Sequence, residues 1–254
     1  MTKEQLFTRI PIFGMIHLAG SSPVQRALEE MSLFQEEGLD GVIVENYHSS
    51  IENVTKTLEE AKKSNPKILI GINILPNGFA SAFSLAHKYG ADFIQLDYVA
   101  GRYTNGERLN IEDYTKEREK HPDVFILGGV WPKYYHPQPG SNLENDLRVG
   151  IERAEAIVVT GAGTGQETPI QKIQQFRSIL GTHPLIVGAG LTPDNAYQQL
   201  SIADGAIVGS YFKKDNQTEN EVERQRVKNL MEMVQEVRKY RRINPNQKIP
   251  IMVI

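Results

Sequence analysis

Several polar side chains stand at the ends of apolar stretches, where proton transfer is one chemistry they could perform. These candidate catalytic residues are Glu45, Asp97, Lys133, Asn73 and His17. A carboxylate in an apolar stretch is costly to bury without a partner, so Glu45, Asp97 and Lys133 are expected to neutralise one another. Burial and neighbouring charges also shift pKa values into the range that general acid–base catalysis uses. The group predicts acid–base chemistry, while a structural ion pair or a solvated position is the alternative for each residue alone.

A second set of residues has the properties of an anion site. Gly188 and Gly190 end one apolar stretch, and Gly209 and Ser210 end the next. Glycine leaves backbone N–H groups open to a phosphate, and a serine hydroxyl adds a further donor. We therefore expect these four residues to bind a phosphate group. The alternative is that the glycines serve only tight turns.

The glycine-rich segment 160–165 follows another apolar stretch and could touch a substrate. Its candidate residues are Thr160, Gly161, Gly163 and Thr164. Such a loop can form a second anion nest or a flexible lid, or it can be mobile without any ligand. It lacks the spacing of a P-loop or a dinucleotide fingerprint, and no His, Asp and Glu spacing resembles a metal motif. We expect neither a cofactor nor a metal.

The elements that must position these residues alternate along the chain. Eight short apolar runs, rich in Ile and Val, are typical of strands covered on both faces. They are 12–17, 41–46, 68–73, 93–99, 124–131, 156–161, 185–190 and 205–210. The segments between them have helical periodicity. One helix is expected to begin at Ser22 and Pro23 and to end at Gly38, and a longer charged helix is expected over 219–241.

This alternation favours a single (β/α)8 barrel of the ribulose-phosphate-binding type over residues 1–254. The length suits one such barrel, and no linker interrupts it. The competing architecture is an open doubly wound sheet, but no strand-to-helix turn has the spaced glycines of a dinucleotide fold. In a barrel the carboxyl ends of all strands meet at one mouth. Every candidate residue above would then lie at that mouth.

Composition limits the partners and the compartment. A net charge of −3 gives no reason to expect nucleic acid or an anionic membrane as a partner. The chain has no cysteine, and its beginning lacks the apolar stretch of a signal peptide. We expect a cytoplasmic protein without membrane insertion. The apolar end, 249–254, is expected to pack on the barrel or on a neighbouring subunit, which favours a homo-oligomer.

The strand ends, taken together, resemble one known family. The matching segments are 14–18, 20–23, 41–46, 71–75, 90–94, 158–165, 188–193 and 203–210. In this order they are similar to the BtpA/SgcQ family over nearly the whole chain, most specifically at 41–46 and 158–165. The resemblance implies a ribulose-phosphate-binding barrel. One branch of that family is linked to photosystem I biogenesis, another to sugar-utilisation gene clusters, and members are often labelled as phosphoribosylanthranilate isomerase-like.

Two departures accompany the resemblance. The family commonly has an acid and a Lys-His pair near the fifth strand, where only Lys133 matches. The isomerase uses a cysteine at the end of its first strand, where this chain has Met15 and His17. The sequence favours an isomerase or lyase acting on a small phosphorylated sugar or nucleotide-like compound, with phosphoribosylanthranilate isomerase as one version. A non-catalytic barrel that binds a phosphorylated metabolite, or an assembly factor, is the alternative.

Overall fold

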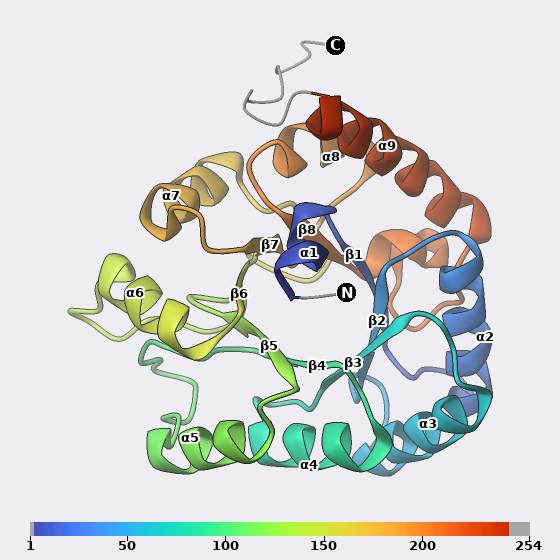
Figure 1. The fold of residues 1–254 in the computed structure, drawn as a ribbon, viewed down its shortest axis with the longest axis horizontal. Helices are drawn as coiled ribbons and strands as arrows, with labels where there is room; N and C mark the ends of the chain where they lie inside the picture. Colours follow the sequence, from blue (N-terminus) through green and yellow to red (C-terminus); the bar gives the residue numbers. More distant parts are fainter. Residues whose placement is uncertain (1–2, 244–254) are drawn as a thin grey trace.

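The computed structural model describes residues 3–243, in which parallel strands close into a barrel inside a ring of helices (Figure 1). The strands are β1 (Ile12–Ile16), β2 (Gly41–Glu45), β3 (Leu69–Asn73), β4 (Phe93–Leu96), β5 (Phe125–Gly129), β6 (Ala156–Val159), β7 (Leu185–Val187) and β8 (Gly205–Val208). Each strand pairs in parallel with the next, and Phe13 of β1 lies beside Ile207 of β8 to close the cylinder. The (β/α)8 barrel is confirmed, and each strand lies inside one of the apolar runs.

The helices differ from expectation at the two ends of the chain. They are α1 (Lys3–Thr8), α2 (Pro23–Glu36), α3 (Ile51–Ser64), α4 (Phe79–Tyr89), α5 (Ile111–Lys120), α6 (Leu143–Arg153), α7 (Ile170–Leu180), α8 (Pro193–Leu200) and α9 (Arg224–Ile243), with 3-10 turns η1 (Ser210–Phe212) and η2 (Lys214–Asn216). The last helix begins at Arg224 rather than 219, because the backbone folds back to pair Lys213 with Val222. No helix within residues 3–243 combines the length and apolarity that crossing a membrane requires. The apolar segment 249–254 lies outside the described residues, so its packing stays a prediction.

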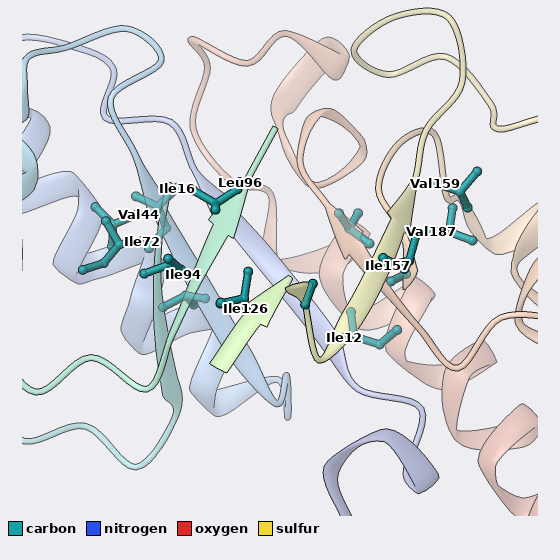
Figure 2. Packing of buried hydrophobic residues seen from close by; sticks show 14 of the residues in the cluster. Ile12, Ile16, Val44, Ile72, Ile94, Leu96, Ile126, Ile157, Val159 and Val187 are labelled. Atoms are coloured by element: carbon teal, nitrogen blue, oxygen red, sulfur yellow. The ribbon is translucent and has the colours of Figure 1, made fainter. Parts of the chain in front are cut away.

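Alternate residues of each strand face opposite sides of the barrel wall, as the strand period of two requires. One set packs outward against the helices and forms the larger core. Figure 2 shows part of this set: Ile12, Ile16, Val44, Ile72, Ile94, Leu96, Ile126, Ile157, Val159 and Val187. The other set fills the barrel interior and includes Phe13, Met15, Ile43, Phe93, Phe125, Leu127, Val158, Ile186 and Ile207. The wall is therefore buried on both faces.

The amino-terminal end of the interior is closed by α1, which the apolar pattern did not predict. Leu6 and Phe7 of this helix belong to the interior cluster, and the ring of Phe7 lies 6.3 Å from that of Phe125. In Figure 1 the helix lies near the centre of the ring of strands. Continuing along the same inner faces toward the carboxyl ends, the next inward positions are polar residues or glycines, such as His17, Glu45 and Gly209.

Candidate active site

A pocket of about 380 Å³ opens at the carboxyl ends of the strands. The candidate residues that line it are His17, Glu45, Asp97, Lys133, Thr160, Thr164, Gly188, Gly190, Gly209 and Ser210. Several stand two residues beyond an interior core residue on the same strand, as His17 follows Met15 and Glu45 follows Ile43. The strand period thus brings them to one place, in a volume suited to a small molecule.

Glu45 is a buried carboxyl group that forms no ion pair with any residue of the described range, 3–243. It is 6% exposed, and its Oε1 accepts a hydrogen bond from Asn73 Nδ2 at 2.7 Å. Burial raises the pKa of Glu45 to about 7; the charge of Asp97 adds to this, while Lys133 and the Asn73 hydrogen bond oppose it. Asn73 lies behind Glu45 rather than in the pocket lining. Near neutral pH the Glu45 carboxyl can therefore both accept and release a proton.

Asp97 lies on the inner face at the end of β4. Its Oδ2 accepts a hydrogen bond from the Tyr135 hydroxyl at 2.9 Å. Burial raises the pKa of Asp97 above its usual range, against the hydrogen bond from Tyr135 and the charge of Lys133. The backbone of β5 passes so close that a Cβ on Gly129 would lie 1.9 Å from the Asp97 carbonyl oxygen. Glycine at this position is what allows the two strand ends to meet.

Lys133 does not neutralise the carboxyl groups as the sequence suggested. In the part of the chain that the structure describes, its ammonium forms no ion pair with Glu45 or Asp97. Its Nζ instead donates to Thr164 Oγ1 at 2.9 Å. A hydrogen-bonded turn holds this arrangement, since the Lys133 backbone N–H donates to Thr160 Oγ1 at 2.6 Å. The lysine lowers the pKa values of both carboxyl groups through its field, without direct contact.

The glycine-rich loop after β6 folds over this pocket. Thr160 and Thr164 line it, whereas Gly161 and Gly163 pack within the loop. A Cβ on Gly161 would lie 2.6 Å from the Glu167 carbonyl oxygen, which explains the glycine without any ligand. The Tyr134 hydroxyl ties the loop down by accepting from the Thr164 N–H at 2.8 Å and donating to Thr164 Oγ1 at 3.1 Å.

The four candidate anion-binding residues meet at the β7 and β8 side of the pocket. Gly190 has a φ of +69°, and a Cβ there would lie 2.2 Å from the Gln166 carbonyl oxygen. Both the backbone angle and the close approach of the β6 loop therefore require glycine. Ser210 opens the single 3-10 turn η1, and a Cβ on Gly165 would lie 2.8 Å from the Ser210 hydroxyl oxygen. Three loops thus converge around these backbone groups.

His17 lies against this glycine side of the pocket. It is 3% exposed, and a Cβ on Gly209 would lie 2.9 Å from its Cε1. Its buried Nδ1 has no hydrogen-bond partner within the part of the chain that the structure describes. Burial and then the positive charge of Lys213 hold the pKa of His17 well below its ordinary value of 6.5. The imidazole is therefore neutral near pH 7.

Sequence reasoning missed several residues of the pocket. Gln95 is an inward polar residue of β4, two positions before Asp97, and its buried Oε1 has no partner in the described part of the chain. A polar residue inside an apolar strand was the available signal. Tyr47 and Tyr134 are exposed at the pocket edge, 38% and 54%, and nothing in the sequence distinguished them from core aromatic residues. Across residues 3–243, no three His, Asp or Glu side chains gather as a metal site would require.

Comparison with known proteins places this chain among close and distant relatives. A model described as the BtpA family matches residues 11–236. An uncharacterised protein of Pyrococcus horikoshii is 30% identical, with 91% of this chain and 98% of that protein covered. The photosystem I biogenesis protein BtpA of Synechocystis is 26% identical, with 90% and 89% covered. Phosphoribosyl anthranilate isomerase from Thermus thermophilus shares the fold, with a TM-score of 0.63 at 11% identity over 90% and 100% of the two chains.

Proposed function

The chain belongs to the BtpA family, and we propose that it is an enzyme that moves a proton on a small phosphorylated sugar or nucleotide-like metabolite, as isomerases and lyases do. The observation that carries this proposal is the buried Glu45 carboxyl group, which lines the pocket and has a raised pKa. A carboxyl group whose pKa is raised to about 7 is matched to general acid–base catalysis near neutral pH. A solvated or ion-paired carboxylate would titrate far lower.

Each neighbour of Glu45 has a part in the proposed chemistry. Glu45 removes a proton beside a carbonyl group and returns it at the adjacent carbon. Lys133 is 2.9 Å from Thr164 in the free protein, and its ammonium stabilises the negative charge that develops on the substrate oxygen. Asn73 acts as a positioning residue, because its hydrogen bond fixes the Glu45 carboxyl group. Asp97 raises the pKa of Glu45 by charge repulsion.

The proposed anchor is the phosphate group of the substrate. Gly188, Gly190, Gly209 and Ser210 line the same pocket as Glu45, on the side formed by β7 and β8. Phosphate sites of (β/α)8 barrels are frequently built at this pair of strands. The Gly188 N–H already donates to the Val159 carbonyl oxygen at 2.8 Å. The donors proposed for the phosphate are therefore the backbone N–H groups of Gly190, Gly209 and Ser210, with the Ser210 hydroxyl.

Two narrower readings make different predictions. Phosphoribosylanthranilate isomerase activity is one version of the proposal, in a chain that has no cysteine. A barrel that binds a phosphorylated metabolite without turning it over is the other, and the name of the Synechocystis relative, a photosystem I biogenesis protein, belongs with that reading. The experiment below separates them.

The test is a thermal-shift screen with phosphorylated sugars and nucleotides, followed by turnover assays on every compound that stabilises the protein. A ligand at about a hundred times its dissociation constant adds about 2.7 kcal/mol of stability. Glu45→Gln is expected to retain that shift and to lower kcat by about a hundredfold to ten-thousandfold. Lys133→Ala tests the proposed electrostatic role, and Glu112→Gln on the exposed face of α5 serves as the control.

A different result would contradict each part of the proposal: the phosphate anchor, the catalysis and the assigned base. If no phosphorylated compound stabilises the protein, the phosphate anchor is wrong. If a compound binds and is not converted, the non-catalytic reading replaces the enzymatic one. If Glu45→Gln leaves turnover unchanged, the assigned base is wrong.

A further inference from the structure

His17 is better suited to contact an anion than to act as a base. Its Cε1 and Nε2 lie against Gly209 at the proposed phosphate anchor, 2.9 Å and 3.2 Å from where a Cβ on that glycine would stand. Its Nδ1 is fully buried, with no hydrogen-bond partner among residues 3–243. Its neighbour His48 is already occupied, because its Nε2 lies 2.8 Å from Thr218 Oγ1. Nε2 is therefore the ring nitrogen of His17 that is placed to contact an anion at this anchor.

The charged groups around His17 are cationic. They are Lys213 after β8, Arg26 on α2, Lys133 after β5, and the titratable His48 after β2. Each of them lowers the pKa of His17, after the larger effect of burial. A site surrounded in this way disfavours a cation and favours a ligand with negative charge.

Behind His17 lies a cluster in which a buried lysine, Lys213, and the half-buried Arg26 both bond to Glu30. Glu30 Oε1 accepts from Lys213 Nζ at 2.5 Å and from Arg26 Nε at 3.2 Å. Two cations therefore share one carboxylate. Lys213 is 1% exposed, and the buried Arg26 Nη2 has no partner among the residues that the structure describes. Because water screens such a charge poorly, its field reaches the neighbouring ring of His17.

We propose that His17 recognises the phosphate dianion of the ligand, and that ligand binding brings one proton from the solvent onto its imidazole ring. This inference rests on the proposed function, since it assumes a phosphate at Gly190, Gly209 and Ser210. The step is a simple protonation: neutral imidazole plus a proton released by buffer gives imidazolium, and no bond of the phosphate changes. The dianion supplies the negative charge that the free site lacks.

Protonation of His17 has a definite consequence for affinity. The bound phosphate raises the pKa of His17, whereas burial and the surrounding cations depress it in the free protein. Ligand affinity therefore rises as pH falls from the pKa of His17 in the bound protein toward its pKa in the free protein, because the bound state takes up the proton. The charge-assisted hydrogen bond also adds to affinity, by about tenfold to a hundredfold.

The direct test is nitrogen NMR of the histidine side chains in the full-length protein at about pH 8, above the ordinary pKa of histidine. Inorganic phosphate is the probe, and chloride at equal ionic strength is the blank. The His17 signal is assigned by its contacts with Gly209 and by its loss in His17→Gln. On saturation with phosphate, both ring nitrogens are expected to show the protonated pattern. His48→Gln is the matched control and leaves this change intact.

A second experiment uses a substitution that removes the buried charge of Lys213 while keeping a side chain of similar length. Lys213→Met leaves Arg26 and Glu30 as a balanced pair, and is expected to weaken phosphate binding several-fold. Glu45→Gln is the control for proton uptake, since Glu45 also titrates near neutrality. Proton uptake on binding, measured by calorimetry in two buffers of different ionisation enthalpy, is expected to persist in Glu45→Gln and to vanish in His17→Gln.

The two proposals fail in different ways. If phosphate shifts the amide signals of Gly190 and Gly209 while His17 stays neutral, the inference about His17 is overturned and the phosphate anchor stands. If phosphate at saturating concentration moves neither those amides nor His17, the proposed function fails and takes this inference with it. Proton uptake that survives His17→Gln and disappears in Glu45→Gln also overturns the assignment.

Discussion

The two ends of the barrel interior are built on the same strands and have opposite character. At the amino-terminal end the inward residues are Phe13, Phe93 and Phe125, covered by Leu6 and Phe7 of α1. Toward the carboxyl end, the inward positions include His17, Glu45 and Asp97 together with Gly129 and Gly188, and they surround a pocket. Burial of apolar surface stabilises the first end, while burial of unpaired polar groups costs free energy at the second. The residues that stabilise the barrel and the residues that form the pocket therefore lie at opposite ends of its axis.

The largest expected effect on stability is at the closed end. Phe93 is fully buried, with ring centroids 5.0 Å from Phe13 and 4.8 Å from Phe125. Phe93→Ala is expected to lower the free energy of unfolding by about 3–5 kcal/mol, through lost burial and the cavity left behind. Chemical denaturation measures this. Tyr134→Ala removes a ring of similar size at the open end, and an equal loss there would contradict the division.

At the open end, replacing Glu45 is expected to raise the free energy of unfolding rather than lower it. Its pKa is raised above the ordinary 4.5 to about 7, so the folded chain holds this proton more tightly than the unfolded chain. The stability linked to this group is full below the ordinary value and is lost as pH rises through about 7. At about pH 8, Glu45→Gln is expected to be more stable than the unaltered protein, by on the order of 3 kcal/mol. Denaturation curves across pH check this, and a variant less stable at all pH values would refute it.

The smallest expected effect concerns the loop over the pocket. Tyr134→Phe removes the hydroxyl that accepts from the Thr164 N–H. One hydrogen bond contributes about 1 kcal/mol, so global unfolding should change little. Hydrogen exchange at the Thr164 amide should speed up, because the loop opens without the rest of the barrel. Unchanged exchange there would mean that other contacts hold the loop. The amides of β4 provide the internal reference.

Much of this division could be predicted from the sequence. The apolar runs located all the strands, because residues buried on both faces leave an uninterrupted signal. The strand-end positions of His17, Glu45 and Asp97 predicted that these residues meet at one mouth of the barrel. Gln95 was not predicted, because it lies within β4 and only the strand period of two turns its side chain inward.

The contacts between loops could not be predicted. That Lys133 bonds to Thr164 rather than to a carboxyl group depends on how two loops, after β5 and β6, meet in space. Gly161 looked like a ligand-binding glycine, but its space is taken by the backbone of its own loop. The helix α1 has only six residues, too few for a periodic pattern to predict it. Its position depends on apolar contacts with the inner ends of the strands, which are distant in sequence.

Closure of the barrel by α1 also limits how a ligand leaves the pocket. Because Leu6 and Phe7 fill the amino-terminal end, a molecule that enters the pocket leaves through the opening at the carboxyl end. In the proposed enzyme, product therefore leaves through the same opening that admits substrate. Tyr47 and Tyr134 line the pocket and are exposed at that opening.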